Sequence, residues 1–234
     1  MITISPNALS PLSVTLGAMG ALPGLANPLV VGSSPGWTPA TSLTVAELVD
    51  AAHQRWGAAP HAAATLAWKS YTYWVAMPAV LGWAVARRVP AVDAANVAVK
   101  VNGSPLITVG LRQGASIGLA DVDHHEDALL RYLRASLLEE HLDPLAERIS
   151  QEVNVGRRTL LGSVASGIAY AIVRAGNAVP NPVDSITTLL KALDLDHLVD
   201  IVPGEQPEVR RRTCCLAFTL PQPKICTGCC LRHT

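Results

Sequence analysis

The sequence predicts a mainly α protein of the α+β class: a helical body of about six helices, one small β-hairpin and a cysteine-rich C-terminal segment. Three observations predict this class. Helix-capping patterns or helix-starting prolines open most of the apolar runs. The alternation that is typical of a strand is confined to one stretch near residue 100. All five cysteines lie between residues 214 and 230.

The composition indicates a globular protein with a substantial core. Half of the 234 residues are hydrophobic, only 15% are charged, and the net charge is about zero. A neutral chain lacks the basic footprint of nucleic-acid binding, so we expect no nucleic-acid partner. The run Met1–Ser5 has no positively charged region of the kind that opens a secretory signal. We therefore expect a cytoplasmic protein, with peripheral attachment at the inner face of the membrane left open.

The first element that the sequence specifies well is a helix after residue 44. Residues 1–44 are rich in Pro, Gly, Ser and Leu with little periodicity, which predicts an irregular lead-in. A capping-box pattern at 44–47 then opens a helix to about Trp56, and Gly57 is a natural C-cap. The lead-in is expected to pack along the body through Val14, Leu16, Leu22 and Leu25.

A second helix is predicted from Pro60 to about Val89. Its part from Ser70 to Ala86 has 17 residues and no charge, which is at the short limit for a membrane span. Because this part contains Pro78, we interpret it as a buried central helix, kinked at that proline, and expect no integral span. The alternative use of its aromatic residues is as the wall of a ligand pocket, with Trp68 and Trp74 as candidate contacts.

A β-hairpin is predicted from about 95 to 112, where alternating valines precede the turn pair Asn102-Gly103. Pro105 predicts that the return strand starts late or lies at an edge. Further helices are expected at 123–141, with an Asp123/Glu126 cap, at 143–153, at 157–175 before Gly176 and at 181–193, followed by a turn at 196–199.

The cysteines form two pairs. Cys214 and Cys215 are adjacent, and after ten residues Cys226 and Cys229 form a Cys-x-x-Cys hook. Such a hook can turn both sulfurs towards one metal, and Gly228 fits the turn because glycine tolerates positive φ. Adjacent residues of a strand face opposite sides, so the first pair reaches one centre only if the chain kinks or if the centre has several atoms.

The C-terminal pattern resembles the signature of the FhuF-like ferric-siderophore reductases. The resemblance covers residues 211–229: Arg-Arg-Thr-Cys-Cys, the following Leu-Pro and the C-C-x10-C-x2-C spacing. It implies a [2Fe-2S] cluster on Cys214, Cys215, Cys226 and Cys229. The cluster would be held by a C-terminal segment, residues 205–234, and the substrate cleft would be formed by a mainly helical body, residues 1–204. Cys230 departs from the signature as a spare thiol, an alternative ligand or an oxidation liability.

The resemblance implies a ferric-chelate reductase. One electron would reduce Fe³⁺ in a siderophore, of hydroxamate type, and release Fe²⁺ for iron assimilation. No dinucleotide-binding or Walker motif is present, so the electron would come from an external ferredoxin-like or flavin-dependent partner. Arg212, Lys224 and Arg232 flank the cysteines and are candidate contacts for substrate or partner.

Two other classes of function remain open from the sequence. Four thiolates could hold zinc in a structural knuckle of a non-enzymatic binding protein, although zinc knuckles more often use two Cys-x₂₋₄-Cys hooks. The segment could also be an electron-transfer or redox-sensing module whose cluster never meets a siderophore.

Overall fold

The computed structural model describes residues 9–32, 35–101, 103–118 and 126–232. It is mainly helical with three small sheets, which confirms the predicted class. The helices are α1 (Ser10–Ala18), α2 (Val45–Trp56), α3 (Pro60–Ala86), α4 (Glu126–Arg134), a π-helix (Ala135–Leu142), α5 (Asp143–Val153), α6 (Arg157–Ala175) and α7 (Pro182–Ala192).

The strands form one four-stranded sheet in the order β1-β5-β4-β2 and two two-stranded sheets, β3-β6 and β7-β8. β1 lies parallel to β5, and the other pairs are antiparallel. The strands are β1 (Leu25–Val30), β2 (Thr38–Pro39), β3 (Arg88–Pro90), β4 (Val97–Val101), β5 (Ile107–Leu111), β6 (Ser116–Gly118), β7 (Val199–Val202) and β8 (Glu208–Arg211).

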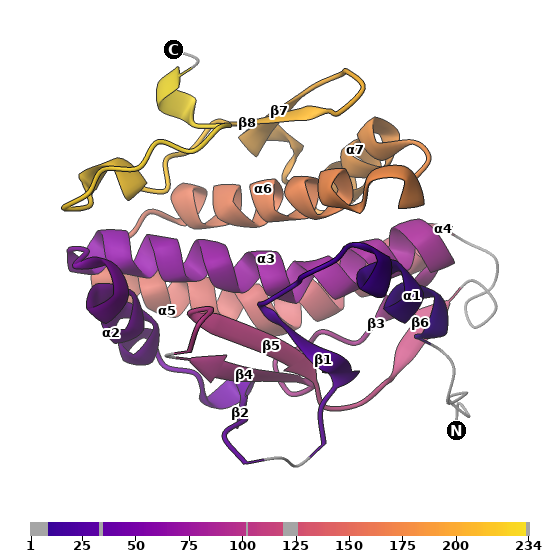
Figure 1. The fold of residues 1–234 in the computed structure, drawn as a ribbon, viewed down its shortest axis with the longest axis horizontal. Helices are drawn as coiled ribbons and strands as arrows, with labels where there is room; N and C mark the ends of the chain where they lie inside the picture. The colour runs from indigo at the N-terminus through magenta and orange to yellow at the C-terminus, as the bar shows by residue number, and fades with distance from the viewer. Residues whose placement is uncertain (1–8, 33–34, 102, 119–125, 233–234) are drawn as a thin grey trace.

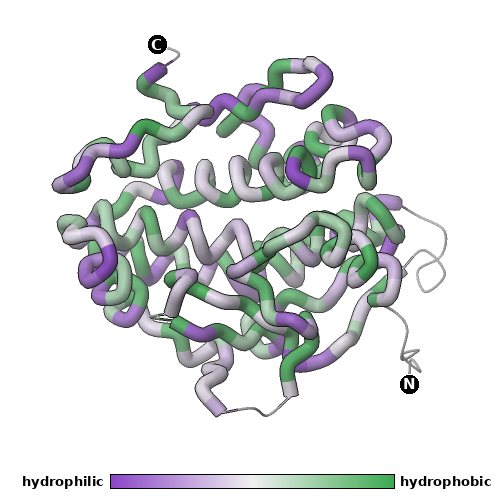
Figure 2. Tube along the Cα trace, in the orientation of Figure 1, coloured by the Kyte–Doolittle hydropathy of each residue, from purple (hydrophilic) through white to green (hydrophobic). Residues whose placement is uncertain are grey.

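Helices α3 and α6 pack against each other at the centre of the molecule (Figure 1). The four-stranded sheet lies on the far side of α3, and the C-terminal segment covers the outer side of α6. Hydrophilic residues are frequent along the β7-β8 hairpin (Figure 2), whereas the buried faces of α3 and α6 are apolar. The C-terminal segment is therefore attached to the two most buried helices of the fold.

Local sequence signals set the boundaries of α2 and α6 as predicted. Thr44 Oγ1 accepts the N–H of Glu47, and the Glu47 carboxylate accepts the N–H of Thr44 at 2.8 Å, which completes a capping box. Gly57 ends α2 at φ 62°, and Gly176 follows α6 at φ 54°.

The prediction for residues 1–44 was wrong in part. The described part contains α1 and β1, and Val14, expected to pack inward, is 70% exposed, whereas Leu16 and Leu25 are buried. β1 was missed because Pro28 interrupts it and its burial does not alternate. A parallel partner far along the chain, β5, is what holds it in place.

Two other boundaries differ from the prediction, and of the two alternatives given for the strand after Pro105 the late start is confirmed. α3 ends at Ala86 because Arg87 adopts a left-handed conformation at φ 50°. β5 does start after Pro105, but it lies inside the sheet between β1 and β4 and is not an edge. The expected break before Asp143 is bridged by the π-helix, so the chain stays helical from Glu126 to Val153.

Two sequence signals, the turn at Asn102 and the cap at Asp123, lie outside the described residues. Within the described part, one helix, 157–178, is long and apolar enough to cross a membrane by length and composition. Of its most apolar stretch, 67% is buried inside the fold, as in the core helix of a soluble protein. It is therefore weak evidence for a span.

Candidate metal centre and adjoining pocket

The β7-β8 hairpin brings the two cysteine pairs together. β8 leads directly into Cys214 and Cys215, and its last residue, Arg211, donates its N–H to the carbonyl of Gly228 at 2.9 Å. The loop that carries Cys226 and Cys229 is thereby held beside the start of the first pair. Residue 204, the proposed boundary between body and cysteine segment, lies in the turn of this hairpin. That division stays a prediction.

Gly228 is required for close approach to β8. A Cβ atom at this position would lie 1.9 Å from the Val209 carbonyl oxygen and 2.4 Å from the Tyr170 hydroxyl. The positive φ that we expected for Gly228 is wrong, since its φ is not in the left-handed region. The left-handed residue is Leu216 at φ 60°, so the chain changes direction directly after the adjacent cysteines.

The five sulfurs gather without forming one compact group. Cys215 forms a hydrogen bond with Cys226, and Cys230 lies beside both Cys214 and Cys229. No three of these sulfur atoms lie within 4.8 Å of one another. A tetrahedral zinc site, with Zn–S bonds of about 2.3 Å, holds all four sulfurs within about 3.8 Å of one another. Cys215 with Cys226 is the one side-chain hydrogen bond that the described structure gives between two of the four predicted ligands, and the other side-chain hydrogen bonds between cysteines involve Cys230.

The surroundings favour thiolate at Cys215. Its pKa is lowered to about 5, first by the hydrogen bond with Cys226 and then by Lys69, the Ala217 N–H and Arg211. The same pairing, with burial, raises the pKa of Cys226, so the two sulfurs share one proton. Leu216 also donates its N–H to Cys214 Sγ at 3.3 Å. Backbone donors of this kind are typical of metal-bound thiolates.

Arg211 is a buried cation without a carboxylate partner among the described residues. Its side chain is 3% exposed, and its Nη2 donates to Ser163 Oγ at 3.1 Å. Its Nε and Nη1 have no hydrogen-bond partner there. A buried guanidinium needs compensating negative charge, and its electrostatic effect on Cys215 shows that the cysteine site faces it.

The flanking cations predicted from the sequence lie at the surface of the cysteine segment. Arg212 forms a half-exposed ion pair with Asp200, Lys224 is exposed, and Arg232 Nη2 donates to the Ile225 carbonyl at 3.4 Å. None of the three lines the pocket described below.

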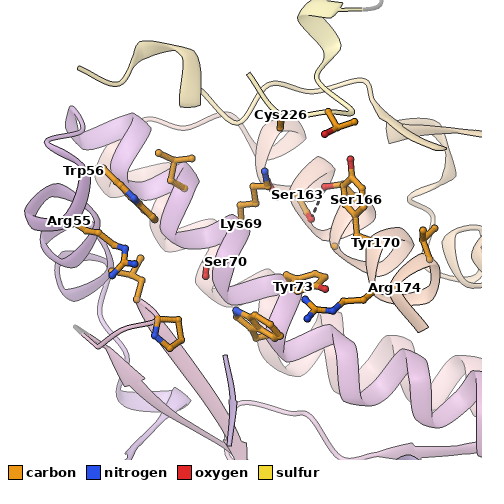
Figure 3. A pocket seen from close by; sticks show the side chains of 17 residues that line it. Arg55, Trp56, Lys69, Ser70, Tyr73, Ser163, Ser166, Tyr170, Arg174 and Cys226 are labelled. Carbon is orange, nitrogen blue, oxygen red and sulfur yellow. Dashed lines mark hydrogen bonds between the residues drawn. The ribbon is translucent and has the colours of Figure 1, made fainter. Parts of the chain in front are cut away.

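A pocket of about 680 Å³ adjoins the cysteines between α2, α3, α6 and the C-terminal segment (Figure 3). Cys226 and Thr227 form part of its wall. Trp74 lines it, but Trp68 does not: Trp68 is fully buried and donates to the Leu160 carbonyl at 2.9 Å. The expectation that Trp68 contacts a ligand is therefore corrected to a core role.

Sequence reasoning missed most of the pocket residues, because they come from four separate elements. One signal was present: Lys69 is the single Lys, Arg, Asp or Glu in α3, at the start of the uncharged stretch. A lone lysine in a buried helix faces a space that can hold charge. The other missed residues that carry chemistry are Arg55, Tyr73, Ser163, Ser166, Tyr170 and Arg174.

No protein-family model matches this chain, and no curated protein or solved structure is significantly similar to it.

Proposed function

We propose that this protein is a ferric-siderophore reductase with a [2Fe-2S] cluster on Cys214, Cys215, Cys226 and Cys229. One observation carries the proposal: the Cys226 side of the cysteine site is also a wall of the 680 Å³ pocket. Pockets for small ligands commonly measure about 300–1,000 Å³. The redox centre and a substrate in the pocket would therefore be separated only by the side chain of Cys226.

The donor set supports this cofactor. The hydrogen-bonded pair Cys215 and Cys226, the backbone N–H groups on Cys214 and Cys215, and buried Arg211 suit an anionic cluster. When bound, the cluster would supply electrons singly, as the reduction of Fe³⁺ to Fe²⁺ requires. The chain's own part is to position: β8 and Gly228 hold the cysteine loops, while α3 and α6 shape the pocket.

The reaction suits the chemistry of siderophores. Their hard oxygen donors hold Fe³⁺ tightly and Fe²⁺ far more weakly. A substrate iron that gains one electron is thus released, and the chelator oxygens take up protons. The electron would come from a ferredoxin-like or flavin-dependent donor in the cytoplasm. Three exposed apolar side chains in the cysteine segment, Phe218, Ile225 and Leu231, give such a partner a surface to contact.

The first experiment identifies the metal. Anaerobically purified protein should be red-brown, contain about two irons and two acid-labile sulfides per chain, and bleach with dithionite. A colourless protein with one zinc and no sulfide, even after anaerobic reconstitution, would contradict the proposal and leave a structural zinc knuckle.

The second experiment separates a reductase from a redox sensor. Dithionite-reduced protein, freed of excess reductant, is mixed with a ferric siderophore and with ferric citrate at equal iron concentration. A reductase is reoxidised faster by the siderophore, and a ferrous chelator then captures one Fe²⁺ per electron. Equal rates with both chelates would favour an electron-transfer or sensing role.

A further inference from the structure

The pocket beside Cys226 is a cationic space. Arg55 from α2, Lys69 from α3 and Arg174 from α6 contribute to its lining. Among the described residues that line it, none is an aspartate or a glutamate. Figure 3 shows these three cations on different sides of the same pocket.

None of these three cations forms an ion pair with a carboxylate in the described part of the chain. Arg174 Nη2 donates to the Ala21 carbonyl at 2.7 Å and hydrogen-bonds Tyr73. Among the described residues, Arg55 donates to the Gly103 carbonyl at a long 3.4 Å and lies 6.0 Å from the centroid of the Trp56 ring. Neutral carbonyl oxygens satisfy donors but leave the charge in place.

Of the three pocket cations, Lys69 is the one that acts electrostatically on the cysteine site. It is half-buried, and the only electrostatic partners that it shows in the described structure are Cys215 and Cys226. Its ammonium therefore stands between the cysteine site and the pocket. Because Lys69 already faces the anionic cysteine site, a negatively charged ligand in the pocket would be attracted most directly by Arg55 and Arg174.

The remaining walls are aromatic. Trp56, Trp74, Tyr73 and Tyr170 line the same pocket, and Tyr73 and Trp74 contact each other edge to face with ring centroids 4.7 Å apart. Flat aromatic ligands stack on such walls, and arginines also lie favourably against aromatic rings.

We infer that the pocket selects anionic, aromatic ferric chelates of the catecholate class, in preference to hydroxamates. Three singly charged hydroxamates neutralise Fe³⁺, whereas three doubly charged catecholates leave a strongly negative complex with aromatic rings on its outside. The neutral hydroxamate complex gains little from the cations of the pocket, and the negative catecholate complex gains from them, most directly from Arg55 and Arg174. This inference rests on the proposed reductase function and differs from the hydroxamate preference that the resemblance implied.

The test is equilibrium binding of redox-inert chelates to the full, cluster-loaded protein. Gallium(III) replaces iron in a tricatecholate and in a neutral trihydroxamate of similar size, and binding is followed by titration calorimetry. We expect the tricatecholate to bind at least tenfold more tightly at low ionic strength. This preference should shrink as salt increases, because screening weakens charge interactions.

Variants of the pocket cations test whether the preference for the tricatecholate arises in this pocket. Lys69→Gln and Arg174→Gln should each weaken tricatecholate binding about five- to tenfold and leave trihydroxamate binding unchanged. Lys191→Gln and Arg131→Gln, at exposed positions on α7 and α4, are matched controls that should change neither. Arg174 has no described contact with the cysteines, so its variant tests the pocket even if Lys69→Gln alters cluster loading.

The outcomes separate this inference from the proposed function. Equal or tighter binding of the trihydroxamate, with reduced protein still reoxidised by ferric trihydroxamate, overturns the inference alone. If neither chelate binds and neither ferric form reoxidises the reduced protein, both the inference and the reductase proposal fail.

Discussion

The N–H of Arg211 donates to the carbonyl of Gly228 at 2.9 Å, and this bond joins the end of β8 to the Cys-x-x-Cys loop. It is a backbone link between the two cysteine pairs, beside the hydrogen bond that Cys215 and Cys226 form with each other. The same two residues place a buried cation and a closely packed backbone beside the sulfurs. The candidate metal site thus depends on a strand that is not itself part of the cysteine motif.

Gly228→Ala should separate this loop from β8. The added Cβ would meet the Val209 carbonyl at 1.9 Å, and neither backbone can yield without moving the cysteines. We expect a loss of about 1–3 kcal/mol in the free energy of unfolding, together with lower iron content per chain. Thermal unfolding and iron analysis measure the two effects.

Gly204→Ala, in the turn of the β7-β8 hairpin against which Gly228 packs, is the control for Gly228→Ala. There the nearest atom to an added Cβ is the Gln206 carbonyl oxygen at 3.5 Å, an ordinary contact. Iron content and stability should stay near the parent values. If Gly228→Ala behaves like this control, the close packing of the loop on β8 is not what holds the metal site.

Arg211→Met tests whether the buried guanidinium balances an anionic centre. With the centre bound, loss of the positive charge should lower iron content and shift the reduction potential to more negative values, because the reduced centre carries more negative charge. The metal-free protein should become as stable as the parent or more stable, since an incompletely bonded buried charge is removed.

Arg212→Met is the comparison at the neighbouring position. Its ion pair with Asp200 is half-exposed, and such pairs contribute about 0–1 kcal/mol. We expect near-parental iron content and potential. An Arg211→Met protein with full iron and an unchanged potential would show that Arg211 has only a packing role.

The sequence predicted those parts of the fold that are encoded locally. The capping box at Thr44 and the glycines after α2 and α6 determine helix ends through bonds within a few residues, and these ends were correct. β1 and the β7-β8 hairpin were missed because their partners or their packing surfaces lie elsewhere in the chain.

The candidate site shows the same division. The spacing of the cysteines is local, and the structure brings them together. The pocket combines Arg55, Lys69 and Arg174 from three helices, so no spacing in the sequence relates them. Trp68 and Trp74 show why sequence alone does not identify the pocket residues. They are six residues apart on one helix, but Trp68 is in the core and Trp74 lines the pocket.

Cys230→Ser should retain about two irons per chain, whereas Cys229→Ser should lose most of them. Cys229 is 5% exposed, and its N–H donates to the Cys226 carbonyl at 3.1 Å, so it closes the Cys-x-x-Cys turn. Cys230 lies just outside this turn, and burial is the first cause that raises the pKa of its thiol. Iron analysis and the visible spectrum compare the variants. The reverse pattern would identify Cys230 as the fourth ligand.

The buried Tyr71–His141 pair predicts a loss of stability in acid that is independent of the metal site. His141 is fully buried, its Nδ1–H donates to the Val92 carbonyl, and its Nε2 accepts from the Tyr71 hydroxyl. Burial lowers the pKa of His141 to about 4, below its usual value of 6.5.

The lowered pKa sets the direction and window of this effect. The unfolded chain binds a proton below pH 6.5 and the folded chain does so only near pH 4, so stability falls as pH decreases between these values. The full loss from this group is about 3 kcal/mol. Metal-free protein should therefore show a Tm that decreases from pH 7 to pH 4.5. His141→Gln should lower the Tm at pH 7 and flatten this decrease, whereas exposed His61→Gln should do neither. An unchanged slope in His141→Gln would assign the acid sensitivity to other groups.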